Sequence, residues 1–220
     1  MRRGVLVLAA AGVCAFTTIL RAEPAPFAVA ISPQLAELQR SLAGITSVQS
    51  DFVEEKHLSV LQQAVLIKGH LAIQNPGLFS WQVTEPLRFN LLVDGTTLRQ
   101  WDEATGETQE MSMAGNPVFG IITTQLRGWF SGQLESLLAD FDAVADTSAP
   151  APTITFTPRE TSVADKVIRR VTLTFREDRR YIREITIEER NGDWTSMTFM
   201  NTVLNAAIDP TQWEVKPLGR

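Results

Sequence analysis

The sequence predicts a mainly antiparallel β domain that begins with a helix and has short helical segments in its middle. Apolar residues recur at alternate positions over much of the chain, which is typical of half-buried strands. Turn signals such as Asp94 with Gly95 and Asn191 with Gly192 recur about every 8–12 residues, as in a sheet where each strand pairs with the next. Between residues 116 and 140 this alternation gives way to a broader apolar pattern interrupted by glycines.

The first 22 residues predict a secretory signal peptide, which leaves residues 23–220 as a single domain. Arg2 and Arg3 precede an apolar run of about 16 residues, shorter than the roughly 20 that a membrane-spanning helix needs. Ala22 is a small residue at a plausible cleavage point. A membrane anchor, or a lipidated Cys14, is the alternative interpretation, although the apolar run continues beyond that cysteine.

Charge and cysteine content limit what the exported chain can bind. Cleavage removes three arginines and no acidic residue, so the formal net charge changes from −5 to −8. An acidic protein is a poor candidate for binding nucleic acid or an anionic bilayer through charge. Any affinity for lipid must therefore be apolar, and without a cysteine the mature chain has no disulfide or thiolate metal site.

The first elements are expected to be a helix followed by short strands. Ser32 caps the helix, Pro33 occupies its first position and Gly44 ends it. A first strand begins at Val48 and extends as far as residue 60, and Gly69 marks a bend or bulge in the second. The second strand and the four after it are expected at residues 65–74, 79–83, 89–93, 97–102 and 108–113.

The second half is expected to begin with helices and then return to strands. Asn116 and Pro117 open one or two short apolar helices, and residues 133–138 add another turn or two. Residues 146–152 are expected to form a loop. The remaining strands are expected at residues 153–157, 167–176, 181–189 and 194–204, which makes about ten or eleven strands in all.

Catalytic machinery is not evident in the sequence. His57 and His70 lie on polar strand faces, and alternation points the neighbouring Glu54 and Glu55 to opposite faces. The nucleophile-elbow, phosphate-loop and zinc-protease motifs are absent. Acidic residues are interleaved with the arginines between residues 169 and 183, which indicates a solvated strand face. A face that docks a partner is the alternative interpretation. We therefore expect a protein that is not an enzyme and has no cofactor or metal.

Aromatic rings dominate a stretch punctuated by proline and glycine. Phe79, Trp81, Phe89 and Trp101 either fill an ordinary core or line a hollow. A twisted antiparallel sheet of this many strands tends to curl. If short helices cover its opening, the interior can be too wide for side chains to fill, and such an apolar space suits hydrocarbon. The pattern by itself leaves both interpretations open.

Three stretches resemble the periplasmic outer-membrane lipoprotein carrier family, the LolA-like proteins. SVQSDFVEEK at residues 47–56 is similar to the family's opening strand, S-x-x-A-x-F-x-Q. GHLAIQNPGLFSWQVTEP at residues 69–86 is similar to G-x-L-x-h-x-R-P-x-x-F-x-W-x-x-x-x-P, where h is apolar. LLVDGTTLRQWD at residues 91–102 is similar to V-x-D-G-x-x-L-x-x-Y-x. The order and spacing of these stretches carry the resemblance, which weakens after residue 140.

The resemblance implies an open, incomplete antiparallel β-barrel with a short helical lid over its concave face. It implies a periplasmic monomer that takes lipoprotein acyl chains from an inner-membrane exporter and passes them to an outer-membrane acceptor. A carrier of a different amphiphile or glycolipid and a lipid-sensing regulatory module are the alternatives. A hydrolase is a third, and it would depend on Ser80, His57 or His70.

The same resemblance implies a set of ligand-binding residues. Asn75 stands where the family has an arginine that bonds to the lid, so the latch of this chain is expected to differ. The residues implied to face the cavity from the sheet and from the lid are Leu71, Ile73, Asn75, Phe79, Trp81, Val83, Phe89, Leu91, Val93, Phe119, Ile122, Leu126 and Trp129.

Overall fold

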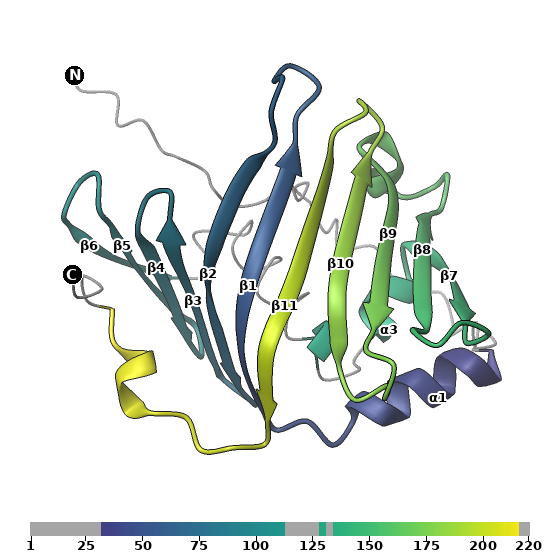
Figure 1. Ribbon diagram of the computed structural model, residues 1–220, viewed down its shortest axis with the longest axis horizontal. Coiled ribbons are helices and arrows are strands. Elements are labelled where there is room, and N and C mark those ends of the chain that lie inside the picture. The colour runs from purple at the N-terminus through teal and green to yellow at the C-terminus, as the bar shows by residue number, and fades with distance from the viewer. Residues whose placement is uncertain (1–31, 113–127, 131–133, 216–220) are drawn as a thin grey trace.

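The computed structural model describes residues 32–112, 128–130 and 134–215. Within these residues, eleven strands form a single antiparallel sheet. The strand order is β6-β5-β4-β3-β2-β1-β11-β10-β9-β8-β7, so β6 and β7 are two separate edges and the sheet stays open (Figure 1). The predicted fold class, an open antiparallel sheet with few helices, is confirmed. The elements are α1 (Pro33–Leu42), β1 (Ser47–His57), β2 (Val65–Gln74), β3 (Leu78–Glu85), β4 (Phe89–Asp94), β5 (Thr97–Asp102), β6 (Thr108–Ser112), α3 (Glu135–Leu138), β7 (Phe141–Asp146), β8 (Thr153–Pro158), η2 (Val163–Lys166), β9 (Ile168–Phe175), β10 (Ile182–Glu189), β11 (Trp194–Leu204) and η3 (Pro210–Trp213).

Helix α1 begins where the sequence predicts. The Ser32 hydroxyl accepts a hydrogen bond from the Leu35 amide at 3.2 Å, and Pro33 occupies the first turn, where no amide donor is needed. The helix ends at Leu42, two residues before Gly44. Its apolar stripe is buried, and the helix contacts edge strand β7 near one end of the sheet (Figure 1).

The sheet consists of two meanders joined by one long-range pairing. Strands β1 to β6 each pair with the next, and so do β7 to β11, as the turn spacing predicts. The joint is the antiparallel pairing of β1 with β11, which brings Phe52 opposite Phe199. Strand β7 was not expected, because its alanines and aspartates have low strand propensity, but it pairs along its length with β8.

Gly69 lies at the irregularity that the sequence predicts. The pairing of β2 with β3 shifts register between Lys68 and Gly69. A Cβ at Gly69 would lie 2.0 Å from the Gln82 carbonyl oxygen and 2.6 Å from the Phe52 ring. Because only glycine leaves this space, the Phe52 ring can pack directly over the β2 backbone.

The two faces of the sheet differ, and we call them the inner and outer faces. The inner face carries the main hydrophobic cluster, in which most side chains are almost completely buried. Along β8 to β11, the inward-facing residues alternate with residues of the outer face, which is largely polar. On the outer face of β3 and β4, Ser80, Asn90 and Leu92 are nevertheless buried, because the C-terminal segment packs there. Asn90 donates a hydrogen bond to the Glu214 carbonyl in that segment at 3.2 Å.

Candidate functional site

The inner face of β2, β3 and β4 brings together most of the residues that the sequence singles out. The register aligns Ile73, Phe79 and Val93 in one row across the three strands. A second row contains Leu71, Trp81 and Leu91. The residues of the predicted set on these three strands that are buried within one hydrophobic cluster are Leu71, Ile73, Phe79, Val83, Leu91 and Val93.

Aromatic rings form a stack in the middle of this face. The Trp81 ring lies 4.0 Å from the Phe52 ring and 6.3 Å from the Phe79 ring, measured between centroids. Phe52 and Phe79 are buried, whereas Trp81 is half-buried, as is Phe89 on the next strand. The rings therefore belong to the packed interior on one side and remain partly accessible on the other. Trp101, by contrast, pairs with Asn90 and so lies on the outer face.

Asn75 lies at the turn between β2 and β3 and is half-buried. Its side-chain amide donates a hydrogen bond to the Ile45 carbonyl at 3.2 Å, and its backbone amide donates to the Thr46 carbonyl at 2.9 Å. The residue therefore ties this turn to the chain between α1 and β1. Its role as a ligand-binding residue stays a prediction.

The residues expected from the lid fall mostly outside the described part of the chain. Phe119, Ile122 and Leu126 lie in residues 113–127 and have no structural account. Trp129 is described and buried, with 7% of its surface exposed. Its neighbour Phe130 packs edge-to-face on Phe199, with ring centroids 4.9 Å apart. This segment thus lies against the inner face near the joint of β1 and β11.

Glu54 is a buried carboxyl group that the set of predicted site residues omits. It shares the inner face with Phe52, lies opposite Ile67 and Met197, and is only 2% exposed. Burial raises its pKa from 4.5 to about 7, although the positive charge of Lys56 opposes the shift. Strand alternation already placed Glu54 and Glu55 on opposite faces, but only the pairing with β11 shows which face is buried.

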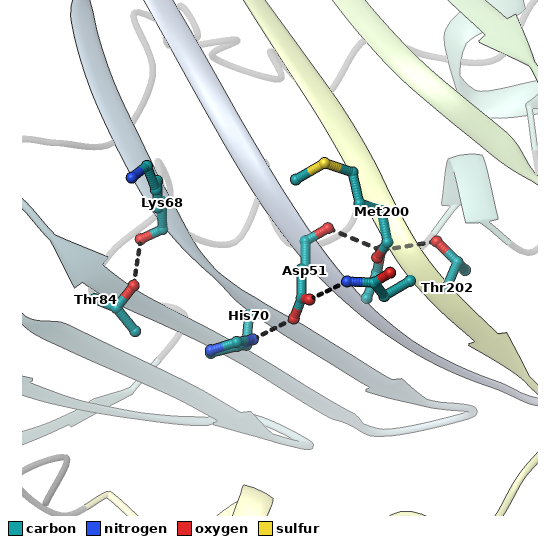
Figure 2. Close-up of polar contacts among 8 residues, drawn as sticks. Asp51, Lys68, His70, Thr84, Met200 and Thr202 are labelled. Atoms are coloured by element: carbon teal, nitrogen blue, oxygen red, sulfur yellow. Dashed lines mark hydrogen bonds and ion pairs between the residues drawn. The ribbon is translucent and has the colours of Figure 1, made fainter.

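The other candidate polar residues lie on the outer face. His70 Nδ1 lies 2.5 Å from Asp51 Oδ1, and Asn201 donates a hydrogen bond to Asp51 Oδ2 at 2.7 Å. Figure 2 shows His70 and Asp51 pointing toward each other from β2 and β1. Hydrogen bonding from Asn201 is the largest cause that lowers the pKa of Asp51. His57 stacks on Trp194, with ring centroids 3.8 Å apart.

These polar groups do not form a metal-binding cluster in the part of the chain that the structure describes. No group of three or more His, Cys, Asp or Glu side chains there could hold a metal ion. Ser80 is buried on the outer face, where Gln82 donates to its hydroxyl at 3.5 Å. Among the same residues, no helix has the length and apolar character to cross a membrane.

Comparison with protein families gives one match that covers most of the chain. The family model described as "Outer membrane lipoprotein carrier protein LolA" matches residues 43–216. An outer-membrane lipoprotein carrier protein of Chromohalobacter salexigens is 23% identical over 172 residues, which are 78% of this chain and 77% of that protein. One from Proteus mirabilis is 29% identical over 100 residues, 42% of this chain and 48% of that protein.

Solved structures similar to this chain share its fold. The crystal structure of MucB has a TM-score of 0.51 and 15% identity, with 84% of this chain and 63% of that chain covered. The Pseudomonas aeruginosa MucA/MucB complex gives a TM-score of 0.50 and 16% identity, with 83% and 59% covered. This chain therefore spans about three fifths of those chains, and at this identity the likeness concerns the fold alone.

Proposed function

The chain belongs to the outer membrane lipoprotein carrier family, and from that premise we propose that it carries lipoprotein acyl chains from the inner to the outer membrane. In this proposal residues 1–22 are a cleaved export signal and residues 23–220 act in the periplasm. An inner-membrane exporter supplies the cargo and an outer-membrane acceptor receives it. The family consists of carriers rather than enzymes, so the described chain needs no catalytic group.

One feature of the inner face carries the proposal. Nine apolar side chains of the described residues pack against the buried cluster yet are themselves only half-buried, and we call five of them, on β2, β3, β4, β10 and β11, the apolar rim. Hydrocarbon laid against such side chains removes further apolar surface from water on both partners. The members of the apolar rim are Val65, Trp81, Phe89, Ile187 and Met197.

Energetics favour an acyl chain as the occupant. Burial of one CH₂ group stabilises a complex by about 0.8 kcal/mol, so several methylenes against the apolar rim give useful affinity without any charge. The acidic composition of the chain gives no general attraction to anionic surfaces. The ligand-binding residues in this proposal are the predicted set on β2, β3 and β4 together with Trp129.

The test measures bound lipid after gentle purification of the mature protein from its native envelope. Mass spectrometry should detect acylated molecules in the wild type. Trp81→Glu places a charge among the rings at a half-buried position, and we expect it to lower lipid uptake more than tenfold while the protein stays folded. Leu91→Glu tests a fully buried position in the same row.

Leu66→Glu is the matched control, since Leu66 is exposed on the outer face of β2. It should leave lipid uptake unchanged. If Trp81→Glu and Leu91→Glu both unfold the protein, the rings serve only as core and the proposal fails. A hydrolase would be supported instead if activity is lost in Ser80→Ala, His57→Ala or His70→Ala.

A further inference from the structure

The carboxyl group of Glu54 lies in largely apolar surroundings on the inner face of the sheet. Its cross-strand neighbours on the inner face, Ile67 and Met197, are apolar. Within the described part of the chain its Oε1 atom is buried and has no hydrogen-bond partner. A buried acceptor without a donor destabilises a protein by about 1–3 kcal/mol, so such groups are rare and each calls for an explanation.

Charge does not explain the buried carboxyl either. Lys56 lies two residues along the same strand and is half-buried, and its positive charge lowers the pKa of Glu54 by less than burial raises it. Glu55, by contrast, lies on the outer face and meets His57 at 2.6 Å. The inner acid is thus left with an open acceptor, whereas its outer neighbour is paired.

The position of Glu54 relates it to the apolar rim. Met197, a rim residue, lies directly opposite Glu54 on β11, and Val65 lies opposite Lys56 on β2. Farther along the inner face, Val48, Ile73 and Phe79 are completely buried. Glu54 therefore lies beside the apolar rim on the inner face.

Trp129 provides a second unsatisfied polar group on the same side of the sheet. Its Nε1 donor is buried and has no hydrogen-bond partner in the described structure. The adjacent Phe130 packs on Phe199, which lies opposite Phe52 on β1. The inner face thus has one acceptor, Glu54 Oε1, and one donor, Trp129 Nε1, that are buried without a hydrogen-bond partner in the described structure. This combination suits a ligand that is mostly hydrocarbon and has one amide-like group.

We propose that Glu54 is a binding residue for the N–H or O–H group at which the hydrocarbon chains of an amphiphilic cargo join its headgroup. The hydrocarbon lies against the apolar rim of the inner face, and the polar junction reaches the Glu54 carboxyl beside Met197. This inference rests on the proposed lipid-carrying function. It adds that the cargo is recognised by one hydrogen bond as well as by its apolar surface.

The experiment compares two probes that differ by one hydrogen-bond donor, N-dodecylacetamide and N-methyl-N-dodecylacetamide. Each displaces the apolar fluorophore diphenylhexatriene from the mature protein, and the displacement curve gives its dissociation constant. One net hydrogen bond predicts that the wild type binds the N–H probe about fivefold more tightly. Glu54→Leu should abolish this preference while it leaves binding of the N-methyl probe unchanged or tighter.

Two variants act as matched controls. Glu54→Gln retains a carbonyl acceptor and should keep the preference for the N–H probe. Glu55→Leu removes the neighbouring acid from the outer face and should keep it as well. Infrared difference spectra of the wild type give an independent readout, because the Glu54 carboxyl band, identified by its absence in Glu54→Gln, should shift only with the N–H probe.

The outcomes separate the two proposals. If neither fluorophore nor probes bind the wild type, the lipid-carrying function itself fails. If both probes bind equally well, or if Glu54→Leu keeps the fivefold preference, only the role of Glu54 fails. An unshifted carboxyl band overturns that role even if Glu54→Leu does not fold.

Discussion

Strand β1 carries two carboxylic acids, one on each face of the sheet, and their environments are opposite. Asp51 on the outer face meets His70 and the side-chain amide of Asn201, which lowers its pKa. Glu54, three residues later on the inner face, is buried among apolar side chains, and its pKa rises to about 7. One strand thus carries one acid held in its charged form and another pushed toward its neutral form.

This difference shows that position on the sheet, rather than residue type, decides what an acid does here. Water and polar partners stabilise a carboxylate on the outer face, whereas burial on the inner face penalises its charge. An outer pair of this kind contributes to strand pairing and is screened by salt. An inner acid destabilises the free protein and is therefore a candidate for function.

The largest expected effect sharpens the contrast in packing. Phe199 on the inner face of β11 is 2% exposed and contacts Phe130, while the adjacent Thr198 points to the outer face. Phe199→Ala should lower the free energy of unfolding by about 3–5 kcal/mol, because it removes a buried ring and leaves a cavity. Thr198→Ala should change it by less than about 0.5 kcal/mol. Urea unfolding of both variants measures the difference, and equal effects would mean that the inner face is not the core.

The next effect is a pH dependence at Glu54. Below the ordinary pKa of 4.5, Glu54 is protonated in both the folded and unfolded states and does not affect stability. As pH rises from 4.5 to about 7, the unfolded chain releases the proton first, so the folded state loses stability. At about 1.4 kcal/mol per pH unit, the full loss reaches up to about 3 kcal/mol.

Glu54→Gln cannot ionise and should escape this loss. Its free energy of unfolding relative to the wild type should therefore rise by up to about 3 kcal/mol between pH 4.5 and pH 8, as measured by urea unfolding across that range. Glu55→Gln removes the same charge from the outer face and controls for net charge. A Glu54→Gln difference that stays constant with pH would show that the carboxyl is not buried in solution.

The smallest effect concerns Asp51. Because its pKa is lowered in the folded state, its contribution is present above the ordinary value of 3.8 and is lost as pH falls through the lowered value. Asp51→Asn should reduce stability at pH 7 by less than about 1 kcal/mol, as expected for a largely exposed pair. The gap should shrink in acid and in high salt, which chemical unfolding can follow. A gap that widens in acid would contradict the assigned pairing.

Much of the local structure could be predicted because it depends on neighbouring residues. The Ser32 cap, the bulge at Gly69 and ten of the eleven strands follow from short-range signals, and their bounds agree within a few residues. The same alternation predicts which residues of β2 to β4 face inward, once one inward-facing residue is known. Strand β7 could not be predicted, since its alanines and aspartates form a strand only when β8 offers a partner.

The sequence by itself determined an antiparallel β domain that resembles a carrier family, because residue alternation, turn chemistry and motif spacing are all local properties of the chain. Only the tertiary structure decided that β1 pairs with β11, which joins residues about 150 positions apart. That pairing buries Glu54, leaves Asp51 at the surface and encloses Phe199. Long-range pairing of this kind depends on which apolar faces can be buried together, and no local pattern specifies it.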